Sequence, residues 1–208
     1  MPRAYLPLLQ ELDQWQAEAR REHPGVIPCR QGCSACCHGP FDISVADVAL
    51  LVEAVTRLPD PVRRGVVAKA HEQVGAMLAI VPDWQPPYAI DAIGDDRFDE
   101  LSDALETVPC PLLDAAGGCL AYERRPMLCR LIGLGLAAES GAVIENACPI
   151  QHRHPDYAAL PPRPFRLDAF ERDEERLKRA AAKRLFDGED GSSYETTVAG
   201  AIVAWVGA

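Results

Sequence analysis

Four of the eight cysteines in this 208-residue chain lie within nine consecutive residues, in the stretch CRQGCSACC. They are Cys29, Cys33, Cys36 and Cys37. A segment this rich in thiols must fold with its sulfur atoms in a small volume. Three explanations are open: a disulfide framework, a metal centre or a redox-active thiol pair. Each makes a different demand on the rest of the chain.

The compartment decides between the first two explanations. The N-terminal sequence MPRAYLPLLQELDQWQ has no apolar segment of signal-peptide length. The longest apolar run, residues 198–206, is too short to span a bilayer. We therefore expect a cytoplasmic protein without a membrane partner. Thiols stay reduced in that compartment, which favours metal binding over disulfides.

Composition excludes another class of partner. The chain carries 31 acidic and 21 basic residues, a formal net charge of -10. Such a charge repels phosphate backbones, so nucleic acid is not an expected partner. Its 48% hydrophobic content is that of a folded protein, and the length suits one domain overall.

The remaining cysteines are Cys110, Cys119, Cys129 and Cys148, so all eight lie between residues 29 and 148. Cysteines used only as small core residues would not be confined in this way. The first four have the spacing C-x3-C-x2-C-C, and short loops of this kind turn two thiolates toward one metal. We predict that all eight cysteines are metal ligands.

The adjacent pair Cys36-Cys37 restricts the kind of centre. Neighbouring side chains in extended backbone point to opposite sides, so both thiols are not expected to bind one small ion. The pair indicates a polynuclear centre, two neighbouring sites, or one thiol that is redox-active or supports the ligands. Eight thiols would also supply four ligands to each of two metal sites. Ligand type alone does not separate iron from zinc, because all-thiolate sites hold both.

Three further residues are candidates for contact with the cofactor. Arg130 follows Cys129 directly, and its charge would balance a thiolate-bound cluster. In the Y-x-x-R-P turn, Arg125 can lie against the ring of Tyr122 or bond to backbone carbonyls near the centre. Histidines near the cysteines are weaker ligand candidates, since surface histidines are common. They are His38, His152 and His154.

The pattern between these motifs predicts a mainly α fold with a small irregular β element (α+β), its helices surrounding the metal-binding centre. Helices are expected over 4–21, after a capping box of Ser44 and Asp47, and from Asp60 as N-cap to Ile80. Residues 82–109 are expected to be irregular. A β-hairpin with residues 139–141 at its tip should precede a charged helix that stops at Gly188, and a final helix is expected to be capped by Ser192 with Glu195. We divide the chain into an N-terminal helix (1–26), a cysteine-cluster metal-binding domain (27–150) and C-terminal helices packed on it (151–208).

These motifs together resemble a known family. CRQGCSACC, ISVADVALL and CPLLDAAGGCLAYERRPMLCR are similar to segments of YkgJ-type cysteine-cluster proteins, which are described as zinc- or iron-chelating and often as containing an iron–sulfur cluster. A related domain occurs in flagellin lysine N-methylases. The matching positions are Cys29, Cys33, Cys36 and Cys37, Asp47, Cys110, Pro111 and Leu113, Cys119, Tyr122, Arg125, Pro126, Cys129 and Arg130, and Cys148 and Pro149.

The resemblance implies a metal-binding protein that holds an iron–sulfur cluster, or iron, for electron transfer or as accessory to a modification enzyme, with a protein redox partner. A structural zinc-chelating module for protein interaction is the first alternative. A thiol oxidoreductase using Cys36 and Cys37 is the second, and it would require a strained vicinal disulfide. No motif marks a substrate pocket, so the sequence leaves open whether the protein is an enzyme.

Overall fold

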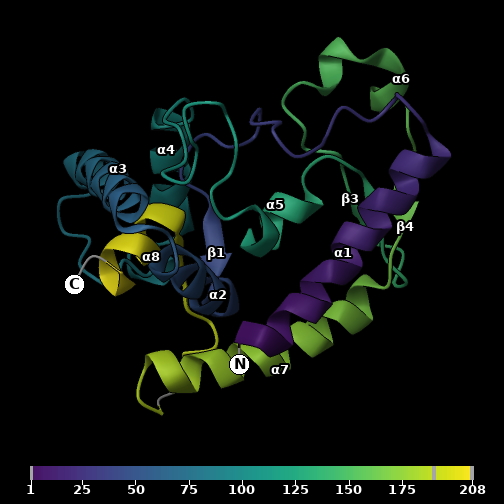
Figure 1. The fold of residues 1–208 in the computed structure, drawn as a ribbon. Coiled ribbons are helices and arrows are strands. Elements are labelled where there is room, and N and C mark those ends of the chain that lie inside the picture. Colours follow the sequence, from purple (N-terminus) through teal and green to yellow (C-terminus); the bar gives the residue numbers. More distant parts are fainter. Residues whose placement is uncertain (1, 189–190, 207–208) are drawn as a thin grey trace.

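The computed structural model describes residues 2–188 and 191–206, and it confirms a mainly helical α+β protein (Figure 1). The α-helices are α1 (Pro2–Glu22), α2 (Val45–Thr56), α3 (Asp60–Ile80), α4 (Asp95–Ala104), α5 (Leu128–Leu131), α6 (Pro155–Ala158), α7 (Leu167–Leu185) and α8 (Val198–Trp205). Short 3-10 turns are η1 (Ile90–Ala92), η2 (Tyr122–Arg124) and η3 (Gln151–Arg153). Helix α1 runs beside α7, and the segment that follows α1 crosses to the part of the molecule built from α2 and α3.

The strands are short and form two small sheets. Strand β1 (Asp42–Ser44) pairs antiparallel with β5 (Glu195–Thr197). Strand β2 (Leu136–Ala137) lies between β3 (Val143–Ile144), its antiparallel hairpin partner, and the parallel β4 (Arg163–Pro164). The hairpin confirms the prediction for this segment.

Local sequence signals predict the cap of α2 correctly and the cap of α3 incorrectly. The capping box of α2 is present, with the Ser44 hydroxyl accepting from the Asp47 amide and the Asp47 carboxylate accepting from the Ser44 amide. Asp60 was the wrong cap for α3, because Pro59 holds that position and Asp60 instead pairs with Arg63 at 2.6 Å.

The predicted final helix is present, but its predicted cap was wrong. Thr197 caps α8, and its hydroxyl accepts from the amide of Gly200 at 2.9 Å. The three residues before α8 are held in an extended conformation by their pairing with β1, so the helix cannot begin earlier.

The acidic segment expected to be irregular contains α4. Its first turn carries Asp95 and Asp96, where the helix dipole favours negative charge, and Leu101 is its buried residue. The acidic side chains therefore mark a helix start as well as a solvated surface.

Apolar side chains form two clusters. The larger joins the first half of α1 to α2, α3, α7 and α8. The smaller joins Trp15 and Ala19 of α1 to Leu134, Leu136 and Tyr157 in the region of the hairpin and α6. Helices α1 and α8 both contribute to the larger cluster, which also contains Cys110. No helix within the described ranges is both long and apolar enough to cross a membrane.

Candidate metal centre

Most of the cysteines face one cavity of about 60 Å³. The seven that line it are Cys29, Cys33, Cys36, Cys37, Cys119, Cys129 and Cys148. The eighth, Cys110, is buried and lines a separate cavity, and its amide donates to the carbonyl of Cys37 at 2.9 Å. All eight are free thiols. Sulfur atoms from four separate parts of the chain are therefore gathered in one place.

Two consecutive turns shape the first cysteine segment. The amide of Cys33 donates to the carbonyl of Arg30 at 2.9 Å, and the amide of Cys37 donates to the carbonyl of Ser34 at 3.0 Å. Gly32 lies in the first turn with a φ of 87°, a conformation that residues with a side chain rarely adopt. These turns let thiols from Cys29 to Cys37 face the same cavity.

Two isolated backbone bridges position the next two cysteines, Cys110 and Cys119. His38 bridges to Pro109, and Leu113 bridges to Cys119. Between these last two residues the Asp114 carboxylate accepts from the amides of Ala116 and Gly118 at 2.8 and 2.7 Å. This turn returns the chain so that Cys119 reaches the cavity.

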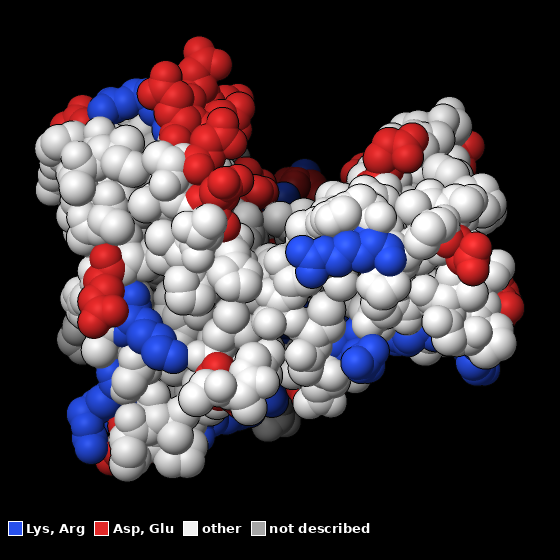
Figure 2. Space-filling view, turned by 90° about the horizontal axis from the view of Figure 1, so that it is seen from above, with Lys and Arg blue, Asp and Glu red and all other residues white. Residues whose placement is uncertain are grey.

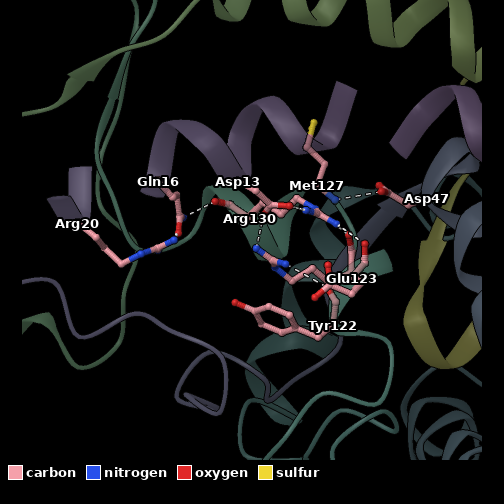
Figure 3. Close-up of polar contacts among 9 residues, drawn as sticks. Asp13, Gln16, Arg20, Asp47, Tyr122, Glu123, Met127 and Arg130 are labelled. Carbon is pink, nitrogen blue, oxygen red and sulfur yellow. Dashed lines mark hydrogen bonds and ion pairs between the residues drawn. The ribbon is translucent and has the colours of Figure 1, made fainter. Parts of the chain in front are cut away.

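Cys129 is positioned by a contact between two helices. It lies on α5, and the amide of Met127 at the start of α5 donates to the Asp47 carboxylate at 3.0 Å (Figure 3). Asp47 is 3% exposed, and its burial raises its pKa to about 6. One carboxylate therefore caps α2 and anchors the turn that carries Cys129.

Cys148 is fixed by its own loop. The side-chain oxygen of Asn146 accepts from the amide of Cys148 at 3.0 Å, and Gln151 donates to the Asn146 carbonyl at 2.8 Å. The hydroxyl of Tyr157 donates to the carbonyl of Gly133, and a Cβ added at this glycine would lie 3.4 Å from the Cys29 sulfur. Cys29 and Cys148 thus share the surroundings of Tyr157.

The environment of the thiols disfavours isolated thiolates. Burial raises the pKa of Cys29 to about 11 and that of Cys110 to about 12, and it raises the pKa of Cys129 well above its usual range. For Cys36 the largest cause of the raised pKa is its hydrogen bond with Cys37, followed by burial. A bound cation reverses this preference, since metals bind the deprotonated sulfur. A buried set of soft sulfur donors fits zinc, iron and iron–sulfur clusters.

The thiols are distributed around the cavity wall. Among the described residues, no three histidine, cysteine or acidic side chains are arranged to hold a single metal ion. His38, His152 and His154 are exposed and are not among the residues that line the cavity.

Tyr122 and Arg125 also line the cavity. The guanidinium of Arg125 lies 4.2 Å from the centre of the Tyr122 ring, and it donates to the Tyr122 carbonyl at 3.0 Å. Its charge acts to lower the pKa of Cys36 and Cys119, against the stronger effect of burial. Arg125 thus places a cation beside the thiols.

Arg130 lies behind the cavity wall and is not among its lining residues. Its side chain is 0% exposed and pairs with Asp13 of α1 (Figure 3). It also donates to the carbonyls of Arg125 and Glu123, each at 3.1 Å. Arg130 therefore holds the backbone around η2 and α5 against α1.

Helix α1 contributes residues to the site that were not predicted from the sequence. Gln16 lines the cavity, donates to the Arg130 carbonyl and accepts from Arg20 at 3.1 Å. Asp13 pairs with both Arg125 and Arg130. Asp13, Gln16 and Arg20 are spaced i, i+3 and i+7, so they share one face of the helix. Their position on one polar stripe, beside a buried apolar face, was the sequence signal that could have indicated a role for these three residues.

Fold and site together define a class: a mainly helical metal-binding protein whose cysteine thiols surround one cavity. A family model labelled CxxCxxCC and described as "Putative zinc- or iron-chelating domain" matches residues 28–149. The match covers more than half of the chain, so the protein belongs to this family, as the resemblance implied. The comparisons with curated proteins and with solved structures found no match.

The chain departs from the family's label at one point. The label has two residues between its first two cysteines, whereas three residues separate Cys29 from Cys33. The turn from Arg30 to Cys33, with Gly32 at positive φ, accommodates the extra residue.

Proposed function

We propose that the protein holds an iron–sulfur cluster, or iron, through its clustered cysteines. The observation that carries the proposal is the cavity lined by seven cysteines, with buried Cys110 joined to Cys37 of its wall by a backbone hydrogen bond. A tetrahedral zinc ion takes four ligands, so this donor set exceeds the need of one ion. Thiolate-rich sites with more than one metal atom are typical of iron–sulfur proteins.

The cluster would supply one-electron transfer, and the chain would supply its ligands and their electrostatic surroundings. Arg125 lies beside the thiols, where a fixed positive charge stabilises a negatively charged cluster. We propose that the protein passes electrons to a protein partner or serves a modification enzyme. The face in Figure 2 is hollowed, and acidic side chains crowd one side of the hollow. With the net charge of -10, this favours a basic partner surface.

A structural zinc module is the second candidate. The cysteine segment from residue 29 to residue 37 is built from turns, and a structural metal commonly fixes such loops. The third candidate, a thiol oxidoreductase using Cys36 and Cys37, is less well supported. Its nucleophile must be a thiolate, whereas the pKa of Cys36 is raised well above the usual range.

Anaerobic purification with iron, zinc and acid-labile sulfide analysis tests the proposal. Iron with sulfide and an absorption band at about 400 nm is the expected result. A colourless protein with stoichiometric zinc would select the structural module. A protein that takes up neither metal after reconstitution would exclude both.

A ligand variant tests the role of the cysteine segment. We expect Cys33→Ser to lose metal and to disorder the surrounding loop while α2 and α3 remain folded. Metal content and helical circular dichroism would be measured together. Ser34→Ala is the matched control, because it changes the next residue, at the start of the second turn, and leaves every thiol in place. Full metal retention in Cys33→Ser would contradict its assignment as a ligand.

A further inference from the structure

We propose that the eight cysteines form two metal centres that meet at the adjacent pair Cys36-Cys37. The inner centre takes Cys110, Cys119 and Cys129, and the outer centre takes Cys29, Cys33 and Cys148. The adjacent pair gives one thiol to each, so that each centre has four. This inference rests on the proposed function only in that the cysteines bind metal, whether iron or zinc. Because no three ligand side chains among the described residues are arranged to hold a single ion, metal binding would have to draw the thiols of each set closer together.

Packing separates the two sets. Cys110 is part of the larger apolar cluster, and Cys37 and Cys119 pack against it. Cys148 is part of the smaller cluster, together with Tyr157. Ile27, two residues before Cys29, packs against that smaller cluster. Cys110 and Cys119 of the inner set and Cys148 of the outer set are therefore held by different parts of the core, and Met127, two residues before Cys129, also packs against the larger cluster.

Backbone contacts divide them in the same way. In the inner set, the amide of Cys110 bonds to the Cys37 carbonyl, and Cys119 bridges to Leu113, whose amide bonds to the Cys110 carbonyl at 3.0 Å. In the outer set, Gly133 closely approaches both Cys29 and the hydroxyl of Tyr157. Each set thus has its own supporting framework.

The adjacent pair suits a boundary position. Consecutive side chains leave the backbone in different directions, so two thiols next to each other in sequence serve two centres more readily than one. Both Cys36 and Cys37 line the cavity. The pair therefore joins the two sets without belonging wholly to either.

Basic side chains lie near both sets. Arg125 lines the cavity with Cys119, and Lys69 lines a separate cavity with Cys110. Arg20 donates to Gln16, which lines the same cavity as Cys29. Cations near both sets are suited to balance two groups of thiolates.

Paired variants of the full chain test the division. Cys129→Ala and Cys148→Ala would be reconstituted anaerobically with iron and sulfide, and separately with zinc. Metal and sulfide per chain and the electron paramagnetic resonance spectrum of the reduced protein would be compared. We expect each variant to keep roughly half of the wild-type metal and to lose a different spectral component, and the double variant to lose both. Loss of all metal in either single variant, or identical remaining spectra, would overturn the proposal.

A second measurement needs no variant. Wild-type protein would be treated with limiting chelator, alkylated and mapped by mass spectrometry. We expect Cys110, Cys119 and Cys129 to lose protection together, and the outer set to lose it together at a different chelator concentration. Simultaneous loss of protection at all eight cysteines would overturn the division into two sets. Two zinc ions per chain without iron or sulfide would contradict the proposed function and leave the two-centre inference standing.

Discussion

Asp13 and Arg130 are 117 residues apart in the sequence, and their side chains form an ion pair at the boundary between α1 and the cysteine-rich segment. Arg130 is fully buried, and the Asp13 side chain is 32% exposed. The carboxylate also pairs with Arg125, which lines the cavity. One acidic residue of the N-terminal helix thus holds two arginines beside the proposed ligands.

Replacing Asp13 should destabilise the protein. Asp13→Ala leaves the guanidinium of Arg130 buried without its carboxylate, and breaking a buried ion pair from one side costs about 3 kcal/mol at the lower end of the usual range. The partial exposure of Asp13 places it at that lower end. We expect this loss in the free energy of unfolding measured with denaturant.

Asp60→Ala is the control for that variant. Asp60 pairs with Arg63 on the surface of α3 at 2.6 Å. Exposed pairs one helical turn apart contribute little, so its effect should stay within about 0.5 kcal/mol. Equal effects of the two variants would show that the Asp13 pair has no special importance.

Asp47 should give the unfolding free energy a characteristic pH dependence. Burial raises its folded-state pKa from 3.8 to about 6. Between these values the folded state binds more protons than the unfolded state, so stability falls as pH rises from about 4 to about 6 and levels off above. A difference of two units corresponds to roughly 3 kcal/mol.

Comparison with Asp47→Asn isolates this contribution. The variant should lack the part of the pH dependence of the unfolding free energy that Asp47 causes. It should also lose some stability, because its amide nitrogen cannot accept a hydrogen bond from Ser44. Glu174 has a raised pKa, chiefly from burial, and contributes a slope of the same sign in both proteins. Both would be measured in the same metal state, because metal binding is itself pH-dependent. Identical slopes would contradict the assignment.

Features encoded within a few residues were predictable from the sequence. The capping box of α2 spans four residues, and the hairpin turn is equally local. The convergence of the cysteines was predictable for a different reason. Thiols confined to one region of a chain have few roles other than metal binding if the compartment is reducing, as the sequence led us to expect. The cavity lined by seven of them agrees with that argument.

Contacts between distant segments were not predictable. Asp13 and Gln16 look like ordinary polar residues of an amphipathic helix, since nothing near them in sequence indicates an arginine more than 110 residues away. The predicted cap of α8 was wrong for the same reason, because the pairing of β5 with β1 decides where that helix begins. Arg130 was expected at the cofactor, and its position behind the wall depends on α1.

Gly133 should tolerate no side chain without an effect on the outer cysteines. Its φ is 112°, and an added Cβ would lie 3.4 Å from both the sulfur of Cys29 and the hydroxyl of Tyr157. Gly141 has a φ of 89° and open space at the Cβ position, so it provides the matched control. Both alanine variants should cost about 1–2 kcal/mol through backbone strain. Metal content should change only in Gly133→Ala, and equal metal content in both variants would contradict this expectation.

Tyr157→Phe should reveal how far the outer centre depends on one hydroxyl. The Tyr157 hydroxyl donates to the Gly133 carbonyl and lies beside Cys148, and its removal leaves that carbonyl without its partner at a cost of about 1–3 kcal/mol. Tyr194→Phe makes the same chemical change at a hydroxyl that donates to Pro87 at 2.6 Å and does not line the cavity. Thermal unfolding should show similar losses for both variants, because each loses one hydrogen bond to a carbonyl. The rate of metal release to a chelator should rise only for Tyr157→Phe, since only that hydroxyl fixes the loop next to two proposed ligands. Equal release rates would mean that the tyrosine stabilises the fold without supporting the centre.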